Sequence, residues 1–331
     1  MGAKYKITII GSGFVGQATG RSFAKLGHQV VFCDTDLEKL AQLEGDGFKT
    51  TLPENIGSFE TDVFFLTVPT PTIAKKIRFD FIFSATKNIA KNYLKHAQND
   101  PLIVVKSTVL PGTTENIIRP LLEKHSGKKA GKDFHVAMNP EYLREKTAQS
   151  DFENPPLILI GSSDDRAKEI LGELYAPYKE KCPIVYLTAT MAEMQKYTHN
   201  LWNATKISYF NEMREVARKL EIDADPIFDL TMQSAEASWN PKYGTKDFGP
   251  FGGSCLPKDT SAFLRWAKDE LKMSLPVLAS VIKINDDLTT RKMMKESPQF
   301  QLGTMSFQPM ISLRMLKKKI PSELLVRNMS F

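Results

Sequence analysis

Cysteines and long apolar runs are both scarce in this sequence of 331 residues. Its three cysteines, Cys33, Cys182 and Cys255, are odd in number and far apart, which argues against a disulfide framework and suits a reducing cytosol. No apolar run approaches the roughly 18–20 residues that would span a bilayer, and the first residues lack the pattern of a secretory leader. We therefore expect a cytoplasmic globular protein of about two domains, with no membrane partner.

The excess of positive charge is confined to the end of the sequence. The formal net charge is +6, and residues 291–331 hold eight Lys/Arg against two Asp/Glu, which accounts for all of it. Because acids and bases balance in the first 290 residues, we expect no nucleic-acid binding. For the basic, Met-rich tail we expect a poorly ordered terminus; an amphipathic surface helix around residues 310–320 is the alternative.

A glycine-rich turn follows the first apolar segment. The run 5–10 predicts a buried parallel strand. It leads into Gly11-Ser12-Gly13-Phe14-Val15-Gly16, a helix to residue 26, a second strand at 29–33 and then Asp34. This order is typical of a dinucleotide-binding unit, in which Gly11 permits the tight turn, Gly13 admits a pyrophosphate and Gly16 lets the helix pack on the strand. A packing role alone is the alternative.

Two side chains bear on which dinucleotide would bind. Asp34 is placed to accept hydrogen bonds from ribose hydroxyls and to repel a 2′-phosphate, which favours NAD over NADP. Lys39 lies one turn into the next helix, where it either covers the adenine-ribose end or is an ordinary solvated lysine.

Further apolar strands are predicted at residues 63–68, 102–105, 134–138 and 157–160, with helical stretches between several of them. This alternation predicts an α/β doubly wound parallel sheet. Polar segments follow three of the strands: Pro69-Thr70-Pro71-Thr72, Lys106-Ser107-Thr108 and Asn139-Pro140-Glu141-Tyr142-Leu143-Arg144-Glu145. Ligands bind outside the carboxyl ends of such strands, although each segment taken singly is more often a cap or a turn.

Two of these segments carry candidate catalytic groups. Thr108 could bond a nicotinamide or a catalytic water. Glu141 and Glu145 are spaced to lie one helical turn apart, which would bring two carboxylates together.

Residues 191–220 are free of Gly and Pro and predict one long helix. Lys196 shares a face of it with three asparagines, Asn200, Asn203 and Asn211. That face is either the lining of a cleft or an ordinary polar surface.

The segment Gly252-Gly253-Ser254-Cys255-Leu256-Pro257-Lys258-Asp259 places a thiol before a helix that we expect to run to about residue 272. A helix N-terminus and a nearby lysine stabilise a thiolate and make it nucleophilic. The alternative is a small buried residue, which suits Cys33 and Cys182 well. No spaced His/Cys cluster predicts a metal site.

These motifs occur in the order seen in the UDP-glucose/GDP-mannose dehydrogenase family, which the sequence resembles over roughly residues 4–288. The resemblance implies a Rossmann-like NAD-binding domain at 1–190, followed by an all-helical central domain at 191–290 that forms a homodimer. The remaining residues, 291–331, form the tail.

The resemblance also implies a reaction. A sugar CH2OH would be oxidised to a carboxylate with two NAD, most simply UDP-glucose to UDP-glucuronate for polysaccharide biosynthesis. Cys255 would form a thiohemiacetal and then a thioester, while Lys196 and Asn200 stabilise the oxyanion. Glu141 would be the acid/base, and Thr108 and Asp259 would position water.

Binding residues follow from the same resemblance. Cofactor contacts are implied for the 11–16 turn and for Asp34, Lys39, Thr70, Thr108, Glu145 and Lys258. Nucleotide-sugar contacts are implied for Glu141, Tyr142, Leu143, Arg144, Glu145, Lys196, Asn200, Gly244, Phe248 and Gly252.

The sequence departs from the family in two places. Residues 239–244 lack the arginine of animal UDP-glucose dehydrogenases, which leaves the sugar nucleotide open. The 41 residues after 290 also show no second nucleotide-binding domain of the usual ~100 residues. A truncated NAD-binding remnant, acting only in dimerisation or interaction, is therefore the alternative to an active enzyme.

Overall fold

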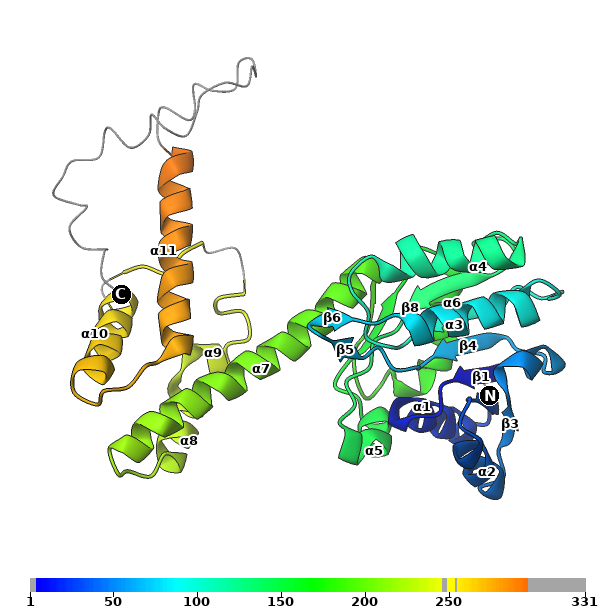
Figure 1. Ribbon diagram of the computed structural model, residues 1–331, viewed down its shortest axis with the longest axis horizontal. Coiled ribbons are helices and arrows are strands. Elements are labelled where there is room, and N and C mark those ends of the chain that lie inside the picture. The colour runs from blue at the N-terminus through cyan, green and yellow to red at the C-terminus, as the bar shows by residue number, and fades with distance from the viewer. Residues whose placement is uncertain (1–3, 246–248, 254, 297–331) are drawn as a thin grey trace, which may run out of the picture. The chain divides into compact units, whose positions relative to one another are not determined.

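The computed structural model describes residues 4–245, 249–253 and 255–296. The chain divides into two compact units, Met1–Ala204 and Thr205–Phe331. The first unit is built on an eight-stranded sheet of order β10-β9-β8-β7-β4-β1-β2-β3 (Figure 1). The second unit is helical in its described part.

The sheet is parallel from β3 to β8, while β9 runs antiparallel to β8 and β10 parallel to β9. Its strands are β1 (Lys6–Ile10), β2 (Gln29–Cys33), β3 (Lys49–Thr51), β4 (Val63–Leu66), β7 (Leu102–Val105), β8 (His135–Met138), β9 (Ile158–Gly161) and β10 (Ile184–Leu187). A separate antiparallel hairpin pairs β5 (Thr72–Ile73) with β6 (Lys76–Ile77). The predicted α/β doubly wound fold is confirmed, with an antiparallel extension at one edge.

Helices cover both faces of this sheet. They are α1 (Phe14–Lys25), α2 (Leu37–Gly45), α3 (Asp80–Ile89), α4 (Arg119–Ser126), α5 (Ala148–Glu153) and α6 (Asp165–Leu174). Residues of α1, α5 and α6 pack in one core cluster, and residues of α3 and α4 pack in another. The sheet is therefore the middle of three layers.

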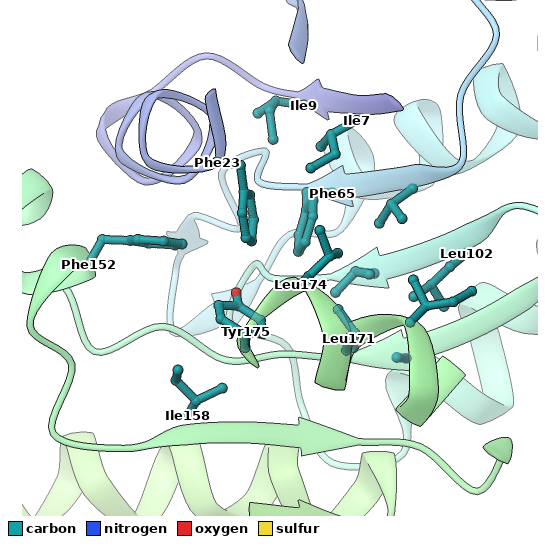
Figure 2. Packing of buried hydrophobic residues seen from close by; sticks show 14 of the residues in the cluster. Ile7, Ile9, Phe23, Phe65, Leu102, Phe152, Ile158, Leu171, Leu174 and Tyr175 are labelled. Carbon is teal, nitrogen blue, oxygen red and sulfur yellow. The ribbon is translucent and has the colours of Figure 1, made fainter. Parts of the chain in front are cut away.

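The central strands β4 and β7 are apolar along their whole length because both of their faces are buried. Ile7 and Ile9 of β1 lie in the first cluster, whereas Ile10 lies in the second. In the first cluster the ring of Phe23 stacks on Phe65 at 5.3 Å and meets Phe152 edge-on at 5.5 Å (Figure 2). Each such ring, once buried, contributes roughly 2–3 kcal/mol.

The long helix α7 (Ala189–Lys219) confirms the predicted helix within two residues at its start and one at its end. It leaves the sheet unit and continues into the second unit. There it is followed by α8 (Asp225–Ser234), α9 (Glu236–Trp239), α10 (Leu256–Asp269) and α11 (Pro276–Glu296). Glu212 of α7 accepts the backbone N–H groups of Val277 and Leu278, at 2.7 and 3.1 Å, and so caps α11.

The helix α11 runs on to Glu296, so the first residues of the basic tail are helical. The rest of the tail, 297–331, lies outside the described residues.

Candidate active site

A cavity of about 660 Å³ runs along the carboxyl ends of five adjacent strands, β2, β1, β4, β7 and β8. Residues that follow each strand line it: Asp34 after β2, Gly11 and Gly13 after β1, Thr70 after β4, Lys106 and Thr108 after β7, and Glu141 after β8. Four strand spacings correspond to about 19 Å, which suits an extended dinucleotide. The polar segments that were predicted to share one edge of the sheet do so.

The glycine turn is shaped for two different purposes. Gly11 has a φ of 98°, which favours glycine, and a Cβ on Gly16 would lie 2.0 Å from the carbonyl oxygen of Gly11. Both glycines are thus required by packing. Gly13, by contrast, has no atom within 4 Å of its Cβ position and is exposed to the cavity. It is also the N-cap residue of α1 and has no side chain that could cap the helix, so the first N–H groups of the helix remain available to a phosphate.

Asp34 stands at one end of the cavity. Its carboxylate accepts the backbone N–H groups of Ser12, Thr35 and Asp36, at 2.5, 2.8 and 3.1 Å. Lys39, which also lines the cavity, forms a hydrogen bond with the Asp36 side chain. This bond and the negative charge of Asp34 raise the pKa of Lys39. This end therefore presents a fixed carboxylate beside a lysine, an arrangement that suits ribose hydroxyls.

Ser12 does not itself line the cavity. It is completely buried, and its hydroxyl has no hydrogen-bond partner in the structure. A buried polar atom without a partner is uncommon in a folded protein, and this one lies in the turn where a dinucleotide would bind.

The loops after β4 and β7 are tied together. The Thr70 hydroxyl donates to the backbone oxygen of Thr108 at 2.7 Å, and the Ser107 hydroxyl donates to that of Val68 at 2.6 Å. Thr108 is half-buried on the cavity wall.

Lys196 of α7 reaches the turn after β8. Its ammonium is 2.5 Å from the backbone oxygen of Glu141 and 3.1 Å from the Glu141 carboxylate, and the side chains are only 6% and 13% exposed. The other carboxylate oxygen accepts the Leu143 N–H at 2.5 Å. The ammonium also lies 5.4 Å from the ring centre of Tyr142. Here the structure brings together a cation and a carboxylate that are 55 residues apart in sequence.

The expected helix joining Glu141 to Glu145 is wrong. Residues 141–144 are not helical: the Glu141 side chain turns back on the Leu143 N–H, and Arg144 is extended. Glu145 is exposed in a 3₁₀ turn (Glu145–Thr147) and does not line the cavity. Arg144 pairs with Asp151 at 2.7 Å, and its hydrogen bond holds the pKa of Asp151 well below the usual range.

Glu193 was not predicted at this site, and for Lys106, whose segment was predicted to lie at this edge, the burial was not predicted. Glu193, fully buried on α7, accepts the N–H groups of Gly112 and Thr114 at 2.5 and 2.7 Å. Lys106 is buried beside Asn139. An acid three residues before Lys196, on the same helix face, was the available signal for Glu193.

In the second unit, Cys255 is the N-cap residue of α10 and is exposed. Lys258 and Asp259 follow in the first turn, 2.5 Å apart. Asn285 of α11 donates to the backbone oxygen of Phe251 at 3.1 Å and so holds the loop before the cysteine. The predicted thiol at a helix N-terminus is confirmed, as are buried positions for Cys33 and Cys182.

The remaining predicted residues are exposed or lie outside the description. Asn200, Asn203 and Asn211 are exposed on α7, in contrast to Lys196. Gly244 and Gly252 are exposed, and Phe248 lies outside the described residues.

Comparison with known families decides the relationship. The profile described as "UDP-glucose/GDP-mannose dehydrogenase family, NAD binding domain" matches residues 5–55 and 47–179, and that of the family's central domain matches residues 190–287. The chain belongs to the UDP-glucose/GDP-mannose dehydrogenase family.

Several members of this family are similar to the chain over most of its length. It is 35% identical to GDP-mannose 6-dehydrogenase of Pseudomonas syringae pv. syringae, over 85% of this chain and 68% of that protein. It is 33% identical to UDP-glucose 6-dehydrogenase AglM of Haloferax volcanii, over 85% and 69%. The solved structure of a ternary complex of GDP-mannose dehydrogenase from Pseudomonas aeruginosa superposes with a TM-score of 0.80 at 31% identity, covering 88% of this chain and 71% of that one.

NAD is the cofactor of the family domain that forms the sheet unit, and the residues present fit it. Gly13 and the fixed Asp34 carboxylate line the cavity, and the Ser12 hydroxyl, buried in the turn between them, has no hydrogen-bond partner. Within the described ranges no three or more His, Cys, Asp or Glu side chains gather as metal ligands. Nor is any described helix both long and apolar enough to cross a membrane.

Proposed function

We propose that the protein is an NAD-dependent 6-dehydrogenase of a nucleotide sugar, oxidising a primary alcohol to a carboxylate. The observation that carries the proposal is the pairing of Lys196 with Glu141, which lines the end of the cavity opposite Asp34. This pair offers a cation for a developing oxyanion beside a carboxylate for proton transfer.

NAD⁺ would supply the hydride acceptor for two successive oxidations, one NAD⁺ for each, with the first NADH exchanged for a second NAD⁺ in between. Cys255 would attack the aldehyde carbon after the first, and the resulting thiohemiacetal would lose the second hydride to give a thioester. Water would then release the carboxylate and regenerate the thiol. Lys196 and Asn200 would donate to the oxyanion, Glu141 would exchange the proton, and Thr108 and Asp259 would hold water.

We propose the same division of binding residues as the sequence predicts. The turn 11–16, Asp34, Lys39, Thr70 and Lys258 would hold the cofactor. Backbone groups from Glu141 to Arg144, together with Gly244, Phe248 and Gly252, would hold the nucleotide sugar. Glu145 is a weaker candidate, because it stands away from the cavity wall.

UDP-glucose and GDP-mannose are the two candidate substrates. Residues 239–244 contain no arginine that would favour UDP-glucose. A GDP-mannose 6-dehydrogenase and a UDP-glucose 6-dehydrogenase resemble the chain at similar identity, 35% and 33%.

Steady-state turnover tests the proposal. Purified protein with NAD and either sugar nucleotide should form NADH, and Cys255→Ser should abolish uronate formation while leaving NAD binding intact. NAD binding without turnover of either substrate would support the alternative, a non-catalytic NAD-binding protein.

We further propose a homodimer assembled through the helical unit. Large apolar side chains of that unit are exposed, among them Ile207 at 61% and Leu230 at 64%, and such surface is usually covered by another chain. Light scattering at micromolar concentration should give twice the mass of the chain, and Ile207→Asp should lower it. A monomer in the parent protein would contradict the assembly.

A further inference from the structure

Lys106 is a buried lysine at the inner end of the cavity. It is the first residue after β7 and only 3% exposed, yet it lines the cavity wall. Its ammonium lies 2.8 Å from the side-chain oxygen of Asn139 and 3.5 Å from the Tyr175 hydroxyl. Both partners are neutral, so these hydrogen bonds hold the amine in place without requiring it to be charged.

Charged groups face Lys106 from two neighbouring elements. Glu141 approaches from the turn after β8 and Lys196 from α7; the first favours the ammonium form and the second opposes it. The Phe152 ring of α5 lies 5.6 Å away. Tyr175, at the end of α6, stays neutral because burial raises its pKa far above the usual value.

Burial outweighs these charges. It lowers the pKa of Lys106 to about 7, so the amine is largely neutral above that pH and charged below it. Most lysines stay charged throughout the working range of an enzyme. Lys106 therefore changes charge where the protein works, on the cavity wall itself.

The position of Lys106 suggests what it responds to. Asp34 lies at the opposite end of the cavity, three strands away across β1 and β4. If the ribose next to the adenine lies by Asp34, as the NAD-binding function requires, the nicotinamide end of the dinucleotide lies toward Lys106. That ring carries a positive charge in NAD⁺ and none in NADH.

We propose that Lys106 links proton binding to the redox state of the cofactor. In its ammonium form it repels the cationic ring of NAD⁺, but it has no charge to oppose in NADH. NAD⁺ binding near neutral pH then releases a proton from Lys106, and conversion to NADH allows the proton to return. The proposal rests on NAD binding and goes beyond the proposed reaction.

Equilibrium binding tests the linkage without any sugar nucleotide. Dissociation constants of NAD⁺ and NADH are measured from about pH 5.5 to 8.5, a range spanning the expected titration. In the parent protein NAD⁺ binding should strengthen about tenfold with rising pH, as one pKa unit of coupling predicts. NADH binding should stay nearly constant.

Two substitutions at Lys106 fix its charge in opposite states and should have different effects on NAD⁺ binding. In Lys106→Met, which has no titrating group, the pH dependence of the NAD⁺ to NADH affinity ratio should disappear. In Lys106→Arg, which stays charged, NAD⁺ should bind weakly at every pH. Lys39→Met, at the other end of the cavity, is the matched control and should change both affinities without a redox preference.

Parallel pH profiles for NAD⁺ and NADH in the parent protein would overturn the linkage, as would an unchanged ratio profile in Lys106→Met. If neither nucleotide binds at any pH, the proposed function itself fails. The measurement thus separates the two failures.

Discussion

Lys196 and Glu141 combine an ion pair with a backbone hydrogen bond in a nearly dry position. At low exposure the attraction between the two charges is poorly screened, so each side chain holds the other in place. The arrangement gives the ammonium one fixed location, which is what stabilisation of a developing oxyanion requires.

Loss of the Lys196 ammonium should affect turnover much more than cofactor binding. Lys196→Met should lower kcat by about 10²–10³-fold, because the oxyanion loses its cation, while the Kd for NAD should change little. Stopped-flow formation of NADH and equilibrium NAD binding measure the two quantities. Lys219→Met, exposed at the end of the same helix, is the control and should retain parental kcat. If kcat fell equally in both variants, Lys196 would have no specific function in the reaction.

At the scale of single elements, the turn between β1 and α1 shows why its glycines are not equivalent. Gly16 lies inside α1 against Gly11, whereas Gly13 lies at its start beside open space. The sequence motif alone treats the two as equal members of one pattern.

Alanine at each position separates their functions. Gly16→Ala should lower the free energy of unfolding by about 3 kcal/mol, because its Cβ would overlap the Gly11 backbone. Gly13→Ala should leave stability nearly unchanged and weaken NAD binding at least tenfold, since its methyl group enters the cavity. Urea unfolding and NAD titration distinguish the variants. Comparable destabilisation by both would contradict this division.

Another element-scale feature is the attachment of α7 to the loop after β7. Glu193 makes this attachment through two backbone N–H groups, three residues before Lys196. Burial raises the pKa of its carboxyl, and the charge of Glu115 adds to the effect. In the folded protein Glu193 therefore holds a proton to higher pH than in the unfolded chain.

The sign of the pH effect follows from this shift. A folded-state pKa above the unfolded value gives stability that is present at low pH and lost as pH rises through the folded value. The stability of the parent relative to Glu193→Gln should therefore fall as the pH rises above the ordinary titration range of a glutamate, at about pH 4. Urea unfolding of both proteins at each pH measures the difference. A difference that grows with pH would refute the assignment.

For the molecule as a whole, the interior of the sheet was predictable and its margins were not. The strands β1, β2, β4, β7, β8 and β9 are mostly apolar and were predicted. β3 is the three-residue strand Lys-Thr-Thr and has no apolar run. β10 is the apolar run Ile184–Leu187 at the edge of the sheet, and it was not predicted although this pattern was present; none of its residues is buried. The β5–β6 hairpin turns on Ala74 and Lys75 at positive φ, without the Asn-Gly signal that such turns usually carry.

The candidate site divides in the same way. Local patterns predicted the glycine turn, Asp34 and the thiol at the start of α10, because each depends on neighbours in sequence. The pairing of Lys196 with Glu141 and the burial of Glu193 depend on how α7 packs against distant loops. Lys106 is surrounded by Asn139, Phe152 and Tyr175, which are also far from it in the sequence. The Glu141–Glu145 spacing was misleading because the Glu141 side chain bonds its own turn instead of joining a helix.

The most direct test of the proposed function is the yield of NADH from a limiting amount of nucleotide sugar. With excess NAD, the protein should form two NADH for each GDP-mannose or UDP-glucose consumed, with a uronate as the product and no free aldehyde. Cys255→Ser should form no uronate. One NADH per sugar with release of an aldehyde would contradict the cysteine-dependent second oxidation, and no NADH with either substrate would contradict the enzyme itself.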